Sequence, residues 1–138
     1  AVAPQNLPEE ALPGKGLRVL VVDDEPSIIR LVQVNLERAG YTIIAAEDGL
    51  QGLRLAREEQ PDVIIMDVMM PHMDGFAVLR KLKENEDTRK IPVIMLTARA
   101  QDADMHHGWQ EGAACYLPKP FNPVELLSHV KNVVVKQS

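Results

Sequence analysis

The sequence predicts a single α/β domain built on a parallel β-sheet with helices on both faces. Two observations point to this class. Short apolar runs of strand length recur from Leu17 onward, and a segment with apolar residues at helical spacing follows each of them. Such alternation favours parallel strands joined by right-handed crossover helices. The 138 residues, of which 46% are hydrophobic, suit one compact domain with a substantial core.

Residues 1–16 are expected to form a flexible tail or linker. The segment AVAPQNLPEEALPGKG holds three prolines and two glycines and shows little apolar periodicity. The alternative is an extension that docks on the domain through Leu7 and Leu12. We take the tail as the prediction and place the domain at residues 17–138.

The first half of the chain predicts three strands separated by two helices. The run LRVLVV at 17–22 is apolar apart from Arg18, which suits a strand covered on both faces. Pro26 is well placed in the first turn of a helix whose apolar residues recur up to Gly40, a residue suited to cap it. The next strand, helix and strand are predicted at 41–46, 49–60 and 62–66.

The second half of the chain predicts two strands and three helices. Asp74 can cap a helix over 75–85, and Asp102 can cap another that ends near Glu111. The strands are predicted at 91–96 and 114–117, and the last helix at about 123–135.

Every predicted strand except the second is followed by polar residues at its carboxyl end. These are Asp23 and Asp24 after the first strand, Asp67 after the third, Thr97 after the fourth and Lys119 after the fifth. Ligands of an open parallel sheet bind beyond the carboxyl ends of its strands. Each residue alone could be a helix cap, a turn residue or a solvated charge. Their gathering from four strands at one edge favours a chemical role.

Three carboxylates at one edge would repel one another, and a small hard cation such as Mg²⁺ (or Mn²⁺) relieves that repulsion. The hydroxyl of Thr97 can bond a phosphoryl oxygen, and the ammonium of Lys119 can pair with one. A carboxylate nucleophile, a divalent metal and two donors can together accept a phosphoryl group. The residues alone leave Asp23, Asp24 and Asp67 as alternatives for the nucleophile.

Four segments carry a family resemblance: VLVVDDEP, VIIMDVMMPHMDGF, IPVIMLTA and CYLPKPF. In order and spacing they resemble the receiver domains of bacterial two-component response regulators, over the chain from Leu17 to its end. The resemblance implies a flavodoxin-like (βα)5 fold, doubly wound, with strand order 2-1-3-4-5. It also implies a switch activated by phosphorylation that catalyses only its own phosphorylation and dephosphorylation.

The resemblance implies roles for individual residues, with Asp67 as the phosphoacceptor. The implied metal ligands are Asp23, Asp24, Asp67 and, through its backbone carbonyl, Met69. The residues implied to bind the phosphoryl group or switch with it are Thr97, Lys119 and Tyr116, the last by rotating inward. The family pattern further implies a cis peptide bond between Lys119 and Pro120.

The resemblance also implies the partners. A sensor histidine kinase or a histidine phosphotransfer protein would donate the phosphoryl group, and Ile29 and Val34 on the first helix are possible contacts for it. The alternative is that both residues are scattered apolar side chains of the surface, which are common in globular proteins. Phosphorylation would change the surface of the fourth helix, fifth strand and fifth helix, through which a homodimer could also form. The sequence does not identify the downstream effector.

The phosphoryl lifetime in this family varies with the side chains two positions after the phosphoacceptor and two after the switch hydroxyl. Here these are Met69 and Arg99. Met69 has no group to position a hydrolytic water, so we expect slow self-dephosphorylation.

Composition argues against several other classes. The net charge of −5 without a Lys/Arg cluster makes direct binding to nucleic acid or a membrane surface unfavourable. No apolar run approaches the ~20 residues of a membrane span, and the single Cys115 fits a reducing cytoplasm. An aspartate-nucleophile phosphatase would carry a second Asp where Met69 stands. A receiver-like module that only binds would lack an acid or the lysine, and none is missing.

Overall fold

The computed structural model describes residues 12–98 and 112–137. The predicted fourth helix, from Asp102 to about Glu111, lies outside the described residues, as does Arg99. Within the described part of the chain, five parallel strands form one sheet in the order β2-β1-β3-β4-β5. The strands are β1 (Arg18–Val22), β2 (Thr42–Ala46), β3 (Val63–Asp67), β4 (Val93–Thr97) and β5 (Cys115–Pro118). The predicted fold class and strand order are confirmed.

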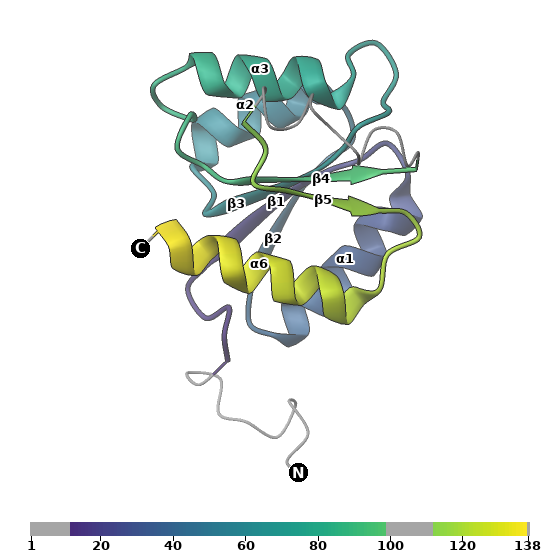
Figure 1. Cartoon of the computed structure of the whole chain (residues 1–138), viewed down its shortest axis with the longest axis vertical. Coiled ribbons are helices and arrows are strands. Elements are labelled where there is room, and N and C mark those ends of the chain that lie inside the picture. The colour runs from purple at the N-terminus through teal and green to yellow at the C-terminus, as the bar shows by residue number, and fades with distance from the viewer. Residues whose placement is uncertain (1–11, 99–111, 138) are drawn as a thin grey trace.

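Helices cover both faces of the sheet (Figure 1). Helices α1 (Pro26–Arg38) and α6 (Pro123–Gln137) lie on one face, and α2 (Gly49–Glu59) and α3 (Gly75–Glu84) lie on the other. Each face has its own buried apolar cluster. Val32 and Leu36 of α1 share one cluster with Leu126 of α6, and Ala56 of α2 shares the second with Leu79 of α3.

Helices start where the sequence carries start signals. Pro26 opens α1, and its ring costs no hydrogen bond because the first turn has no intrahelical acceptor for its nitrogen. The carboxylate of Asp48 accepts from the Gln51 amide at 2.8 Å, and that of Asp74 accepts from the Ala77 amide at 2.9 Å. The predicted cap by Asp74 is confirmed. These starts follow the carboxyl ends of the strands, so they border the edge that holds the site.

A turn at residues 12–16 lies against the connection between α1 and β2. The Gly14 amide donates to the Ala39 carbonyl at 2.7 Å. A Cβ atom on Gly14 would lie 2.4 Å from the Tyr41 ring, and one on Gly40, where φ is +98°, would lie 2.9 Å from Cβ of Leu12. Two glycines therefore permit this close crossing. The contact places Leu12 against the domain, whereas Leu7 lies outside the described residues.

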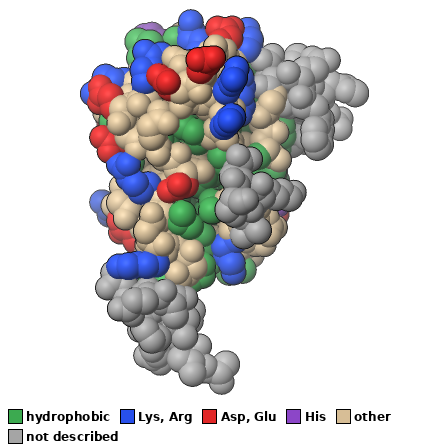
Figure 2. Space-filling view, turned by 90° about the vertical axis from the view of Figure 1, so that its left-hand side faces the viewer, with side chains coloured by type: hydrophobic (Ala, Val, Ile, Leu, Met, Phe, Trp, Pro, Cys, Tyr) green, Lys and Arg blue, Asp and Glu red, His purple; other side chains and the backbone are tan. Residues whose placement is uncertain are grey.

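The described surface is mixed in charge on the face drawn in Figure 2, where acidic and basic side chains are interspersed with apolar ones. In the described part of the chain, every helix is too short or too polar to cross a lipid bilayer.

Candidate functional site

Three carboxylates converge at the carboxyl edge of the sheet, as the sequence predicts. Asp23 and Asp24 follow β1 and Asp67 ends β3, and one oxygen from each lies within 4.8 Å of the others. Asp23 is fully buried and Asp67 is only 4% exposed, while Asp24 is open to solvent. The set thus has two acids in the floor of the site and one at its mouth.

Strand register brings the two buried acids together. Strands β1 and β3 are parallel neighbours with Val22 opposite Met66, so Asp23 and Asp67 each follow the last paired position. The backbone then fixes Asp23, because its amide donates to the Ala46 carbonyl at 3.1 Å and its Oδ1 accepts from the Glu25 amide at 2.9 Å.

Gly75, which belongs to the segment VIIMDVMMPHMDGF but was not predicted as a site residue, shapes the other side of the site. Its amide donates to the Val68 carbonyl at 2.7 Å, which folds the loop after β3 back over the strand end. A Cβ atom at this position would lie 2.3 Å from the carbonyl oxygen of Asp67. The start of α3 can therefore approach Asp67 only because residue 75 has no side chain.

Lys119 reaches both buried acids. Its Nζ lies 3.0 Å from Oδ2 of Asp23 and 3.2 Å from Oδ1 of Asp67, with Oε1 of Glu25 at 3.5 Å. Its own amide donates to the Thr97 carbonyl at 2.7 Å, which ties the segment after β5 to the end of β4. The Lys119–Pro120 peptide bond is cis, as predicted.

The burial of these charges shifts their protonation. Burial, followed by the charge of Asp23, raises the pKa of Asp67 to about 6, against the opposing effect of Lys119. Burial likewise raises the pKa of Asp23, although the Glu25 amide and Lys119 oppose it. Burial alone would lower the pKa of Lys119, but its bonds and charge interactions with Asp23 and Asp67 outweigh that effect and raise it. The site therefore holds excess negative charge that one lysine only partly offsets.

This donor set fits a magnesium ion. Three carboxylates with oxygens at this spacing can share one cation, and Mg²⁺ prefers a few carboxylates together with water and phosphoryl oxygens. Asp24 at the mouth leaves the site open toward solvent. Lys119 is one positive charge beside three carboxylates, so negative charge remains for a cation to neutralise.

Thr97 and Tyr116 lie on the side of Asp67 away from Asp23. Thr97 ends β4, the strand next to β3, and is fully buried. Tyr116 lies on β5 one strand further, with its hydroxyl buried and its ring centroid 6.3 Å from that of Phe76 on α3. The order of the strands thus places Asp67 with Asp23 and Asp24 on one side and with Thr97 and Tyr116 on the other.

Met69 stands two residues beyond Asp67, with 51% of its surface exposed. Its backbone amide donates a hydrogen bond to the Asp67 carboxylate, which lowers the pKa of that group against the larger effect of burial. The proposed role of its carbonyl as a metal ligand stays a prediction.

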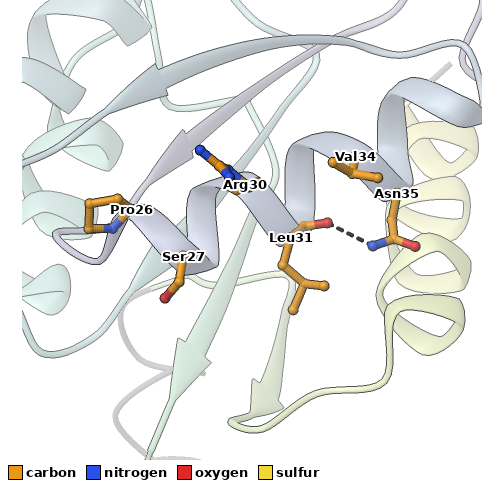
Figure 3. A pocket seen from close by; sticks show the side chains of 6 residues that line it. All are labelled: Pro26, Ser27, Arg30, Leu31, Val34 and Asn35. Atoms are coloured by element: carbon orange, nitrogen blue, oxygen red, sulfur yellow. Dashed lines mark hydrogen bonds between the residues drawn. The ribbon is translucent and has the colours of Figure 1, made fainter.

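The two residues predicted to contact a donor protein line different grooves. Val34 is 44% exposed and lines an apolar groove on α1 together with Leu31 and Arg30 (Figure 3). Ile29 is half-buried against the core and lines a more polar groove between α1, β2 and α2. Leu31 was missed, although its position three residues before Val34 puts both on one helix face.

Comparison with known proteins identifies relatives of this chain. A family model described as the response regulator receiver domain matches residues 19–131. RpaA of Synechocystis, a DNA-binding dual master transcriptional regulator, is 47% identical over 114 residues, which cover 83% of this chain and 47% of RpaA. Protein PilH of Pseudomonas aeruginosa is 39% identical over 117 residues, covering 85% of this chain and 97% of PilH.

A solved structure supports the same grouping. The chemotaxis protein CheY4 of Vibrio cholerae matches with a TM-score of 0.80 at 38% identity, covering 85% of this chain and 98% of CheY4. The chain thus spans about half the length of RpaA but nearly all of PilH.

Proposed function

The chain belongs to the response regulator receiver domain family, and from that premise we propose that Asp67 is its phosphoacceptor. A receiver domain is a phosphorylation-activated switch of two-component signalling. The observation that supports Asp67 over the other acids is the strand order. A phosphoryl group on Asp67 has the acids of β1 on one side and Thr97 on the other, while Lys119 contacts both Asp23 and Asp67. On Asp23 it would lie two strands, roughly 10 Å, from the end of β4.

We propose that Asp23, Asp24, Asp67 and the Met69 carbonyl hold Mg²⁺. Bound Mg²⁺ supplies positive charge that offsets the charge on the transferring phosphoryl group. The burial of Asp23 and Asp67 keeps their oxygens in place before the donor arrives, so little reorganisation accompanies transfer.

The transfer proceeds from a phosphohistidine on a sensor kinase or a phosphotransfer protein. An Oδ atom of Asp67 attacks the phosphorus, the new O–P bond forms as the P–N bond breaks, and the imidazole of the donor leaves. Lys119 already lies 3.2 Å from Asp67, and it pairs with the phosphoryl oxygens as they arrive. Beyond this self-phosphorylation and the reverse loss of phosphate, the proposal assigns the chain no further catalysis.

The switch follows from new partners for the buried polar groups. The Thr97 hydroxyl moves to a phosphoryl oxygen and Tyr116 adjusts beside it, which changes the outer surface of β5 and α6. The predicted surface also includes the predicted fourth helix, from Asp102 to about Glu111, which lies outside the described residues. An effector, or a second copy of the chain, would bind this surface, in a cytoplasmic setting.

The apolar groove of Leu31 and Val34 is the proposed contact for the donor protein (Figure 3). Helix α1 starts at the edge that holds Asp67, so its exposed groove is close to the site that a donor protein would have to reach. We expect Val34→Glu to slow transfer from the donor protein about tenfold while leaving phosphorylation by a small phosphodonor unchanged. Gln33→Glu adds the same charge beside the other groove and serves as the control. Equal effects of both changes would contradict this contact.

The side chain of Met69 is proposed to keep the phosphoryl group on Asp67 for minutes or longer, with Arg99 as the second tuning residue. A thioether accepts hydrogen bonds only weakly and cannot hold a water for attack on phosphorus. Decay within seconds, measured after removal of the phosphodonor, would contradict this assignment.

Incubation with acetyl phosphate and Mg²⁺, followed by intact-protein mass spectrometry, tests the phosphoacceptor. Asp67→Asn should abolish the phosphorylated species, whereas Asp87→Asn, which changes an exposed acid far along the chain, should not. Asp23→Asn keeps the nucleophile and should slow phosphorylation by weakening the hold on Mg²⁺. Phosphorylation of Asp67→Asn at the rate of the unchanged protein would overturn the assignment.

A further inference from the structure

The methionines of the described residues differ sharply in their access to solvent. Met66 and Met95 are fully buried, and Met70 is 8% exposed. Met73 is partly buried against the apolar cluster between the sheet and helices α2 and α3. Met69, by contrast, is 51% exposed. A dissolved oxidant therefore meets the thioether of Met69 before those of the other four.

The exposed methionine also lies close to the phosphoacceptor. Met69 follows Asp67 by two residues, and its backbone amide donates a hydrogen bond to the Asp67 carboxylate. A chemical change on this side chain therefore takes place on a solvent-exposed residue whose own backbone contacts the group that would carry the phosphoryl group. No other described methionine is both exposed and next to a reacting group.

We propose that Met69 is an oxidation site through which peroxide shortens the lifetime of the phosphoryl group on Asp67. The inference rests on the proposed phosphorylation of Asp67. Hydrogen peroxide transfers one oxygen atom to the sulfur, giving methionine sulfoxide and water. The sulfur is oxidised by two electrons and the peroxide is reduced by two, and no charge is added. The step is reversible in cells by methionine sulfoxide reductases.

The sulfoxide changes the chemistry available at the mouth of the site. Its oxygen accepts strong hydrogen bonds, which the thioether does not. It can therefore hold a water in line with the O–P bond of the phosphorylated aspartate. The oxygen of that water bonds to phosphorus as the bond from phosphorus to Oδ breaks. Inorganic phosphate leaves with the protons of the water, and the carboxylate of Asp67 is restored.

Decay of the phosphorylated chain before and after mild peroxide treatment tests the proposal. Cys115→Ser is used as the background because its half-buried thiol is also oxidisable. Peptide mass spectrometry first establishes one added oxygen on Met69. In this background we expect oxidation to shorten the lifetime at least about threefold, and a methionine sulfoxide reductase to restore it.

The matched variant is Met69→Leu, which keeps an apolar side chain that cannot be oxidised. The ratio of treated to untreated lifetimes is compared within each variant, and it should stay near one in Met69→Leu. Met69→Gln carries a permanent hydrogen-bond acceptor and should decay faster than Met69→Leu without peroxide.

Two results would overturn the proposal. One is an unchanged lifetime despite complete oxidation of Met69. The other is an equal response of Met69→Leu, which would assign the effect to another residue. Both results are measured on protein that is already phosphorylated. A failure of phosphorylation at Asp67 would instead appear as the absence of phosphorylated protein before peroxide is added.

Discussion

The two edges of the sheet deal with charge in opposite ways. At the amino edge, the guanidinium of Arg18 donates to the carboxylate and carbonyl of Glu59, and the Arg18 amide donates to Asp62 at 2.8 Å. At the carboxyl edge, Asp23 and Asp67 are buried together and share a single lysine. At the amino edge the charges are paired, whereas at the carboxyl edge negative charge remains in excess until a cation binds.

Removal of Lys119 should give the largest effect on this comparison. In Lys119→Met, two buried carboxylates lose their cation, which should cost about 3–5 kcal/mol of unfolding free energy at pH 7.5 without metal. The loss should shrink as the pH falls toward 5, because protonation neutralises the acids. Urea unfolding at both pH values measures this, with Lys81→Met at an exposed position as the control. A loss that does not change with pH would contradict it.

Asp67→Asn should act in the opposite direction. The pKa of Asp67 is raised from 3.8 to about 6 in the folded chain, so its ionisation destabilises the fold as the pH rises through that range. Asparagine does not ionise. The variant should be more stable than the original at pH 7.5 without metal by up to about 3 kcal/mol, and the difference should vanish near pH 4.

The measurement for Asp67→Asn is urea unfolding across this pH range, repeated with Mg²⁺. Added Mg²⁺ should stabilise the unchanged chain and reduce the gap between the two proteins. A variant that is less stable at pH 7.5 would show that Asp67 is not under electrostatic strain.

Gly14→Ala tests the amino edge. The added Cβ would lie 2.4 Å from the Tyr41 ring, so the turn must move, at a cost of about 2 kcal/mol. Gly16→Ala is the control, because a Cβ there meets nothing within 4 Å and only the positive φ of +81° is unfavourable. In thermal unfolding, Gly14→Ala should have a lower Tm than Gly16→Ala. Phosphorylation by acetyl phosphate should be unchanged in both variants.

Arg18→Gln should give the smallest effect. The side chains of Arg18 and Glu59 are 38% and 40% exposed, so solvent screens their interaction and we expect a loss below about 1 kcal/mol. Arg54→Gln, from a more exposed pair with Glu58, should cost still less. Urea unfolding at low and high salt compares them. If Arg18→Gln lost as much unfolding free energy as Lys119→Met, the two edges of the sheet would not differ in the way described.

The sequence predicted those features that follow from local pattern and from parallel topology. Apolar runs and the helix-start signals at Pro26 and Asp74 locate the elements, and parallel strands must bring Asp23 and Asp67 to one edge. Ile29 and Val34 are five positions apart, about 140° around a helix, so their spacing alone places them on different sides of α1. Which groove each residue lines depends on the neighbouring elements and was not predictable from the pattern.

Contacts between distant segments were the features that could not be predicted. The crossing of Gly14 over Tyr41 joins two loops, and neither carries a periodic signal. The approach of Gly75 to Asp67 depends on the path of the loop after β3, which a motif does not specify. The residues alone left three acids open as the phosphoacceptor; Asp67 was proposed from the family resemblance, and the order of the strands supports that proposal.

The ion pair between Lys119 and Asp23 joins positions 96 residues apart in the chain. During synthesis, the strands that carry the three acids leave the ribosome well before Lys119 does. A nascent chain thus holds its acids without their lysine, and β4 and β5 have yet to join the sheet. Under the proposed function, the site can accept a phosphoryl group only after the segment that carries Lys119 has been translated and folded. A fragment that ends before Lys119 should not accept a phosphoryl group from a donor, even if its first three strands assemble.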